Sequence, residues 1–172
     1  KDKKTISEYL NSKGIDNGVI VFHAVTTNKN MKQNYSGDGK YIGQEFTGYT
    51  LNQTVQINSK EVEKIEKVSR EVTELLNKGI QLYSMSPRYY YTKLEDLKIE
   101  MISRATDNAR LRAESISKNS GATLGELTLA NMGIFQITGQ NSNEDYSWGG
   151  AYNTSSKEKT ASITMKLTYS VK

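Results

Sequence analysis

Residues 93–125 constrain the fold more than any other part of this chain. Apolar residues recur there every three or four positions, which is the spacing of one face of an α-helix and not of a strand. They are Leu94, Leu97, Met101, Ala105, Ala109, Ala113 and Ile116. Gly121 predicts the helix end, because a helix commonly closes on a left-handed residue and glycine adopts that conformation at least cost. The small alanines predict close packing against a sheet or another helix, and nothing in the stretch suggests catalysis.

Two further helices and several strands are predicted around it. Residues 5–13 and 58–78 have helical apolar spacing and end at Gly14 and Gly79. A faint repeat closes both helices, as Leu-Asn-Ser-Lys-Gly-Ile over residues 10–15 and Leu-Asn-Lys-Gly-Ile over residues 76–80. Residues 19–27 are rich in β-branched side chains and predict a strand, and residues 80–85 predict another.

A long strand is predicted over residues 41–57. Its second half alternates, with Tyr49, Leu51, Val55 and Ile57 on one face. Ile42 and Phe46 fall in the opposite phase, so we expect a bulge or bend near Gly48. Residues 160–171 alternate most clearly, which favours an antiparallel sheet at least there. The predicted class is therefore α+β, with helices packed on a mixed or antiparallel sheet and built from helix–strand–strand units.

Size and charge exclude several kinds of protein. The 172 residues suffice for one well-buried domain, and the mean hydropathy of −0.66 is polar for a globular chain. No apolar run approaches the ~20 residues of a membrane-spanning helix. The chain contains no cysteine, which excludes disulfides and thiolate chemistry. The net charge of +4 is mild and not clustered, so nucleic acid is not expected as a partner.

Catalytic and metal-binding patterns are not evident. His23 is the only histidine and lies within a strand pattern, so we expect a structural or surface role. Residues 143–145 come nearest to an acidic metal site, but a solvated acidic loop explains them better. Arg104, Arg110 and Arg112 suggest a solvated or intersubunit helix face rather than an anion site. We therefore predict no enzyme activity, no metal and no cofactor.

Aromatic residues are the most promising binding candidates. Tyr89, Tyr90 and Tyr91 are consecutive, and Tyr146, Trp148 and Tyr152 lie in a polar loop over residues 139–158. Exposed aromatic side chains often mark interfaces, although tyrosines also cover sheet edges. Both interpretations stay open for the loop, and edge covering is favoured for the three consecutive tyrosines. The loop is acidic, which argues against stacking on single-stranded nucleic acid.

The order of these motifs resembles that of the SIMPL domain family. Residues 97–127 resemble its helix-to-strand signature, an alanine-rich helix with Arg112-Ala113-Glu114 that ends in a glycine and is followed by Leu124-Gly125. Gly48-Tyr49 with Val55 resembles a second motif of the family. A third motif of the family is similar to Lys78-Gly79-Ile80 followed by Pro87 and the tyrosines at 89–91. The resemblance covers residues 6–171.

The resemblance implies more than the residues do alone. SIMPL members are bacterial cell-envelope proteins with an α+β fold that assemble as homo-oligomers, including ring- or channel-like ones. The family is linked to stress defence, and it has no established catalytic residues to carry over. Its members usually begin with a strand and a Pro-Asp turn, and this chain starts after them. We therefore expect a single SIMPL-like domain over residues 1–172 without that strand, from a precursor exported by a signal peptide to the periplasm or outer membrane.

The predicted function follows from both lines of reasoning. We expect a non-enzymatic envelope protein that assembles with itself as a scaffold or channel-like ring, and we expect residues 146–152 to contact a second chain. The final strand carries one charge, Lys166, between residues 160 and 171, so it should lie inside a sheet or beneath another subunit. Alternatives are a module that binds sugars or peptides through the Tyr/Trp loop, and a hydrolase, for which no nucleophile–base pair is seen.

Overall fold

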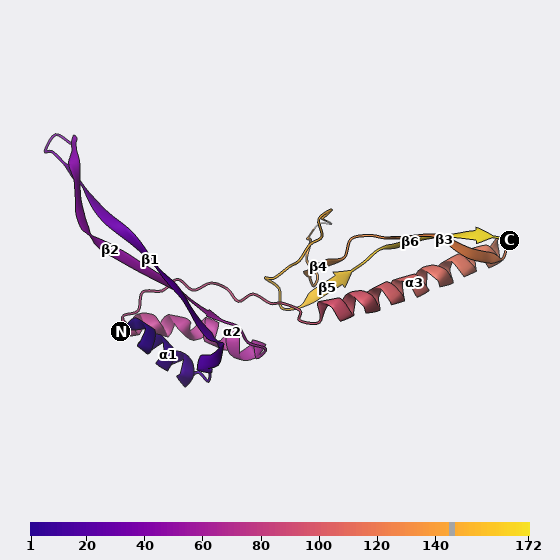
Figure 1. Ribbon diagram of the computed structural model, residues 1–172, viewed down its shortest axis with the longest axis horizontal. Coiled ribbons are helices and arrows are strands. Elements are labelled where there is room, and N and C mark those ends of the chain that lie inside the picture. Colours follow the sequence, from indigo (N-terminus) through magenta and orange to yellow (C-terminus); the bar gives the residue numbers. More distant parts are fainter. Residues whose placement is uncertain (145–146) are drawn as a thin grey trace. The chain divides into compact units, whose positions relative to one another are not determined.

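The computed structural model describes residues 1–144 and 147–172, which divide into two compact units (Figure 1). The first unit covers Lys1–Met85 and the second Ser86–Lys172. The described residues of the first unit form helices and one two-stranded antiparallel sheet, and those of the second form one helix and two such sheets, so the predicted α+β class is confirmed. The single SIMPL-like domain over residues 1–172 stays a prediction. Within the described residues, no helix combines the length and apolar character needed to cross a bilayer.

The core of the first unit lies between its helical segments. These are α1 (Asp2–Ser12), η1 (Asn17–Val19), α2 (Val62–Glu71) and η2 (Val72–Lys78). The buried side chains come from both ends of the unit and are Tyr9, Leu10, Ile15, Val68, Leu75 and Ile80. A Lys13 ion pair with Glu71 at 2.9 Å adds a polar link at the edge of this core.

The repeat that ends in Lys-Gly-Ile builds both helix ends in the same way. Gly14 and Gly79 adopt φ values of 79° and 76°, the left-handed conformation of a helix end. The N–H of Ile15 then donates to the carbonyl of Leu10 at 3.0 Å, and that of Ile80 to Leu75 at 3.1 Å. The isoleucine that follows each glycine, Ile15 or Ile80, is buried in the same core. No strand forms over residues 80–85, so that prediction is wrong: after Ile80 and Leu82 reach the core, no neighbouring strand among the described residues pairs with the segment.

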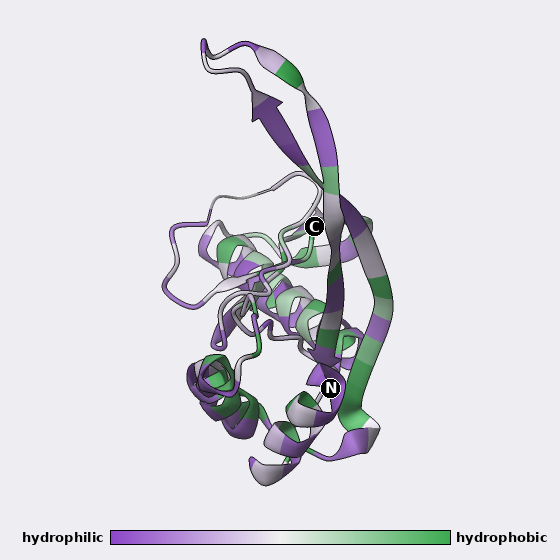
Figure 2. Cartoon of the chain, turned by 90° about the vertical axis from the view of Figure 1, so that its left-hand side faces the viewer, coloured by the Kyte–Doolittle hydropathy of each residue, from purple (hydrophilic) through white to green (hydrophobic). Residues whose placement is uncertain are grey.

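A long antiparallel ribbon extends from this core, formed by β1 (Ile20–Tyr35) and β2 (Tyr41–Ile57) (Figures 1 and 2). Three register shifts interrupt its pairing. One of them falls where Asn30 pairs with Gly48 and Met31 with Phe46, and Gly48 has a φ of 140°. The predicted bulge near Gly48 is confirmed. It returns Phe46 to the face of Tyr49, and the two rings meet edge to face at 5.0 Å.

The second unit is one helix against a second ribbon. Helix α3 (Leu94–Asn119) packs mainly on β6 (Met165–Val171), which pairs with β3 (Leu124–Met132). The ribbon continues through β4 (Gln136–Gly139) and β5 (Lys159–Ser162). Gly121 ends the helix with a φ of 76°, as predicted. The Ile116 prediction is wrong: its side chain is 69% exposed, whereas Ser117 is 5% exposed, because the inward face continues in steps of four from Ala113.

The predicted final strand forms as β5 and β6. Ala161, Ile163, Met165, Leu167 and Tyr169 are half-buried and alternate with exposed polar residues, as the pattern indicated. Both strands pair on one side only, with β4 and β3, among the residues that the structure describes. Of the two solutions expected for this strand, the structure does not show a central place in its own sheet, and coverage by another subunit stays a prediction.

Candidate functional site

A polar network shapes the loop between β4 and β5, and Glu144 is its central acceptor. Its carboxylate accepts hydrogen bonds from the backbone N–H of Gly139 at 2.8 Å, from the Ser142 hydroxyl at 3.3 Å and from the Asn153 side-chain amide. The bond from Asn153, followed by that from Gly139, lowers the pKa of the Glu144 carboxyl below its usual value. Glu144 is exposed, as expected of an acidic loop, and it also ties two parts of the loop together.

Lys159 joins the same network through a hydrogen bond to Asn153. Its ammonium donates to the backbone carbonyl of Asn153 at 2.5 Å, while the Asn153 side-chain oxygen accepts the N–H of Ser156 at 2.8 Å. Burial lowers the pKa of Lys159, and the charge of Glu144 acts in the opposite direction. Asn153 thus joins an anion and a cation that lie on different parts of the loop.

Strand β4 anchors the loop to the ribbon. Gln136 and Ile137 are almost fully buried. The side-chain oxygen of Gln136 accepts the N–H of Ser147 at 3.0 Å. Ile137 donates its N–H to the carbonyl of Ala151 at 2.7 Å and accepts the N–H of Asn153 at 2.8 Å. The backbone on either side of Tyr152 is therefore fixed beside a buried strand.

The structure brings together two aromatic groups that the sequence treats separately. The N–H of Tyr89 donates to the carbonyl of Thr154 at 2.8 Å, which places the consecutive tyrosines beside the loop. The rings of Tyr90 and Tyr152 then lie 6.4 Å apart with an angle of 33° between their planes. Both side chains are partly open to solvent, as is Tyr91. Tyr146, the remaining tyrosine of the predicted site, lies outside the described residues.

Trp148 is held in a turn and faces solvent. The N–H of Gly150 donates to the carbonyl of Ser147 at 2.9 Å, which closes the turn around it. The indole is 87% exposed. Large planar side chains of this kind bring much contact area at low entropic cost, which is why they are enriched in binding surfaces. Tyr90, Trp148 and Tyr152 are together named the aromatic loop surface below, within which the ring contact that the structure shows is that of Tyr90 with Tyr152.

A second apolar surface runs along the β1–β2 ribbon, and it was not expected to be open. Cross-strand partners lie on the same face of a sheet, and those on this face include Lys29 with Tyr49, Met31 with Phe46, and Tyr35 with Tyr41. The large apolar side chains of the face, named the ribbon face below, are Val25, Met31, Tyr35, Tyr41, Phe46, Tyr49 and Leu51. They are between 43% and 65% exposed. The opposite face is polar, with Thr26, Asn28, Thr50 and Asn52.

The alternation over residues 49–57 identified which side chains share this face, but it did not indicate what covers them. Only its base is covered, where Ile20, Val55 and Ile57 pack on the buried cluster. The signal that could have revealed the rest is strand length: β1 and β2 have 16 and 17 residues, far beyond the usual strand of about 5–6 residues. The helices of the unit are too short to cover such a ribbon along its whole length.

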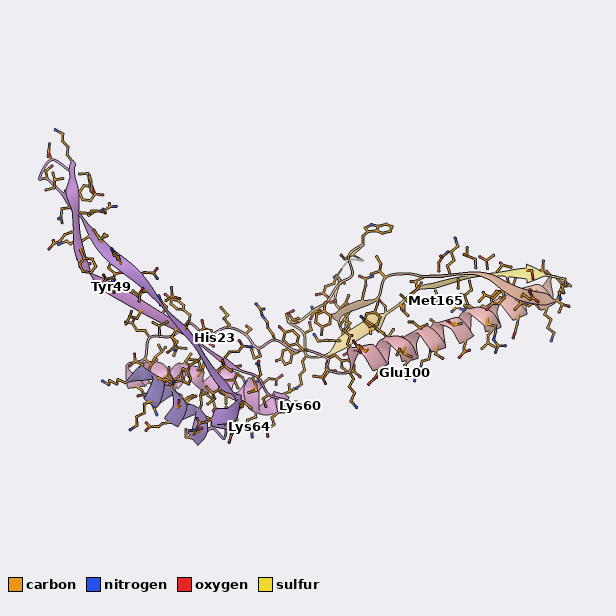
Figure 3. All side chains as sticks on the ribbon, in the orientation of Figure 1. His23, Tyr49, Lys60, Lys64, Glu100 and Met165 are labelled. Atoms are coloured by element: carbon orange, nitrogen blue, oxygen red, sulfur yellow. The ribbon has the colours of Figure 1, made fainter. Side chains whose placement is uncertain are left out.

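His23, Arg104 and Arg110 have structural partners. His23, labelled on the ribbon in Figure 3, lies 3.0 Å from the side-chain oxygen of Gln56 and is exposed. Arg104 pairs with Glu100 at 2.6 Å and Arg110 with Glu114 at 3.2 Å. Arg112 is exposed on the same helix. Among the described residues, no group of three His, Cys, Asp or Glu side chains is placed to hold a metal ion.

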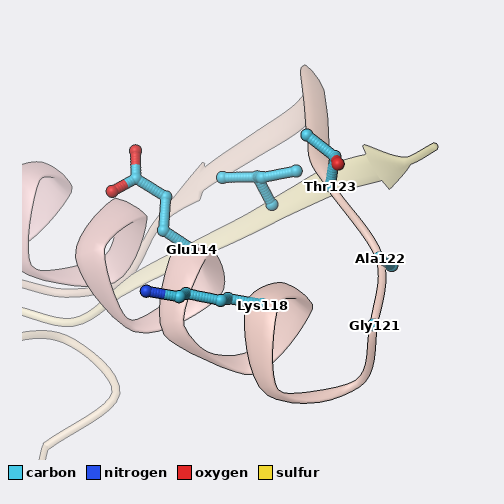
Figure 4. A pocket seen from close by; sticks show the side chains of 6 residues that line it. Glu114, Lys118, Gly121, Ala122 and Thr123 are labelled. Carbon is cyan, nitrogen blue, oxygen red and sulfur yellow. The ribbon is translucent and has the colours of Figure 1, made fainter.

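A surface hollow lies where α3 ends and β3 begins (Figure 4). Glu114 and Lys118 line it from successive turns of the helix, and residues 121–124 form the other wall. Both charged side chains are exposed. The hollow therefore lacks the convergent buried polar groups of a small-molecule site.

Comparison with known proteins gives one result that covers the whole chain. Among curated proteins and among solved structures, none matches it. The family model described as SIMPL, protein of unknown function (DUF541), matches residues 1–172. The chain therefore belongs to the SIMPL family.

Proposed function

We propose that this chain is a non-enzymatic component of the bacterial cell envelope that assembles with copies of itself into a scaffold, in the form of a closed ring or channel. The envelope location and a role in stress defence rest on the SIMPL resemblance. Self-assembly has an additional physical basis in the surface of the chain. Fractionation of cells that express the full precursor tests the location, and recovery with the cytoplasmic proteins would contradict it.

The large solvent-exposed area of the chain is the observation that supports the proposed self-assembly. The chain exposes 13092 Å². Two separate compact proteins, each of half its mass, would together expose only about 10,200 Å². The difference of about 2,900 Å² is in the range that obligate partners bury. A chain with this much uncovered surface is typical of proteins that complete their fold by association.

Mass in solution tests this proposal directly. Sedimentation velocity and light scattering across a hundredfold range of concentration should give a mass that is a fixed multiple of 19.3 kDa. Dilution should leave that multiple unchanged until the dissociation constant is reached. A chain that stays at 19.3 kDa at every concentration would contradict self-assembly.

The proposed lack of enzyme activity rests on the surroundings of the few reactive groups. His23, the sole histidine, contacts Gln56 on an exposed ribbon rather than a nucleophile or a carboxylate. A general base needs a partner within hydrogen-bond reach and a site that positions the substrate. A screen for hydrolase and transferase turnover should give nothing above background. Turnover that is lost in a folded His23→Ala variant would overturn the proposal.

A second candidate function is favoured by the aromatic loop surface. The Tyr90–Tyr152 contact and the exposed indole of Trp148 are suited to stacking on sugars or contacting peptides. Trp148 is the only tryptophan, so its fluorescence reports on this surface alone. Titration with soluble glycan oligosaccharides should change the emission if the surface binds them. A Trp148→Ala, Tyr152→Ala variant separates the two functions: a lower assembly mass supports a subunit contact, and an unchanged mass limits the surface to ligands.

A further inference from the structure

We propose that the ribbon face is the surface on which two copies meet, each covering the same face of the other with the two ribbons running in opposite directions. The inference rests on the proposed self-assembly and specifies its contact surface. It does not involve the aromatic loop surface, which belongs to the other unit. The partner is a second copy of this chain.

The ribbon face extends a strand face whose base already packs in the core of the first unit. On β2 the residues Ile57, Val55, Gln53, Leu51 and Tyr49 alternate without interruption, so they share one face. The first two pack against the buried cluster of the unit. Leu51 and Tyr49 continue the same face beyond the reach of the helices and are mostly exposed. A two-stranded ribbon with one uncovered apolar face is marginally stable in water, and a second layer would stabilise it.

The area of the face fits a specific interface. Its seven large apolar side chains are about half exposed. The four aromatic ones each carry roughly 150–250 Å² of surface, so covering them would bury about 440 Å² from each copy, and the three aliphatic side chains add to this area. Specific protein interfaces bury about 800 Å² from each partner. The ribbon face therefore supplies more than half of the area that a stable pair needs.

The polar residues on the face favour a protein partner over a lipid surface. Lys29 lies beside Tyr49, and Gln33 pairs with Gln44 in the register. The interior of a bilayer offers these groups no hydrogen-bond partner, and burying them there would be costly. A second ribbon brings hydroxyl and amide groups of its own. The same residues that disfavour lipid are thus satisfied by another copy.

The order of residues along the face favours the antiparallel arrangement. Val25 and Leu51 form its smaller, aliphatic end, and Tyr35 and Tyr41 form its larger, aromatic end. Opposed ribbons place the small end of one copy on the large end of the other, which is how facing layers fill space without voids. Near the middle, Lys29 of each copy comes over the aromatic rings of its partner, a favourable cation–π placement. A symmetric contact of this kind uses the same patch twice and closes as a pair, so the proposed ring would be built from such pairs joined through a second contact elsewhere on the chain.

Neighbouring residues on opposite faces give a matched test. Leu51→Asp puts a charge on the ribbon face, and Asn52→Asp puts the same charge on the polar face one residue away. Both side chains are exposed within the unit, so circular dichroism should show both variants folded. At a concentration where the parent is fully assembled, we expect Leu51→Asp to raise the dissociation constant at least tenfold and Asn52→Asp to leave it within twofold.

Crosslinking gives an independent readout, because the chain contains no cysteine. Lys29→Cys places a single thiol near the middle of the ribbon face, and Asn28→Cys places one on the polar face at the same height. A bismaleimide that spans about 10 Å, the separation of two sheets packed face to face, should join two Lys29→Cys chains. It should join Asn28→Cys chains no better than dilution controls.

The outcomes separate this inference from the proposed function. If the parent assembles but both aspartate variants assemble equally and both thiols crosslink equally, the ribbon face is not the contact and self-assembly still stands. If the parent is a monomer at every concentration, both proposals are wrong. If a monomeric parent binds phosphatidylethanolamine–phosphatidylglycerol vesicles and Leu51→Asp abolishes that binding, the face is a membrane surface and the inference is overturned.

Discussion

Truncation of Leu75 tests whether the small core of the first unit holds it together. Leu75 is 3% exposed and lies in the buried cluster with Tyr9 and Val68. Its neighbour in the sequence, Leu76, is 53% exposed and is not part of that cluster. The variants Leu75→Ala and Leu76→Ala therefore delete the same atoms from a buried and from an exposed side chain of one helical turn.

The expected difference follows from burial. Replacing a buried leucine by alanine costs about 2–5 kcal/mol, from lost transfer free energy and from the cavity left behind. The cluster has only six buried members, so its walls can relax, and we expect the lower part of the range, about 2.5 kcal/mol. Leu76 already exposes half of its side chain, and we expect a loss below about 1 kcal/mol.

Hydrogen exchange can measure the loss of stability separately in each of the two units. A loss of about 2.5 kcal/mol corresponds to a rise of roughly 60-fold in the opening equilibrium, so amides of α1 and α2 should exchange faster by that factor in Leu75→Ala. Amides of α3 serve as an internal control and should not change. Equal acceleration in the two variants, or acceleration in α3 as well, would refute the placement of the core.

Three further predictions concern single groups. Tyr9→Phe should stabilise the first unit by up to about 1 kcal/mol in urea unfolding, because the Tyr9 hydroxyl is buried with no hydrogen-bond partner among the described residues; a loss of stability would show that a partner exists. Gly121→Ala should lower the melting temperature of the second unit by about 5 °C because of its φ of 76°, whereas Gly149→Ala in the same unit, where an added Cβ meets no close atom, should have almost no effect. The lowered pKa of Glu144 means that its stabilisation of the loop is present above the unfolded pKa near about 4.3 and is lost as the pH falls through the folded value. The Gly139 amide signal should therefore shift in acid, and a shift that persists in Glu144→Gln would contradict this origin.

Local patterns in the sequence were sufficient to predict the helices and most of the strands, but they wrongly predicted a strand over residues 80–85. The three- and four-residue steps of α3 predicted its inward face from Leu94 to Ala113, because helical periodicity is a property of neighbouring residues. The helix end at Gly121 and the bulge near Gly48 were predictable for the same reason. Ile116 was misplaced because an apolar residue in the last turn of a helix is attributed to the core by type, whereas the geometry selects Ser117.

Long-range relations could not be predicted from the sequence. Alternation in β2 shows which side chains share a face, but what covers that face depends on the other elements of the fold. The contact between Tyr90 and Tyr152 depends on backbone pairing between Tyr89 and Thr154, which no local motif specifies. The role of Glu144 in ordering its loop likewise needs Asn153 and Gly139 to be brought to it.

The register shifts of the β1–β2 ribbon bear on how it can meet another chain. An exposed strand edge invites pairing with other strands, and bulges that twist the edge are a common protection against it. The ribbon has three such shifts, and they divide its outer edges into short regular stretches. Its apolar face is not divided in this way, because the shift at Gly48 restores Phe46 to the side of Tyr49. The ribbon is thus protected against growth by strand addition while its face stays continuous, which favours a limited face-to-face contact over an open-ended one.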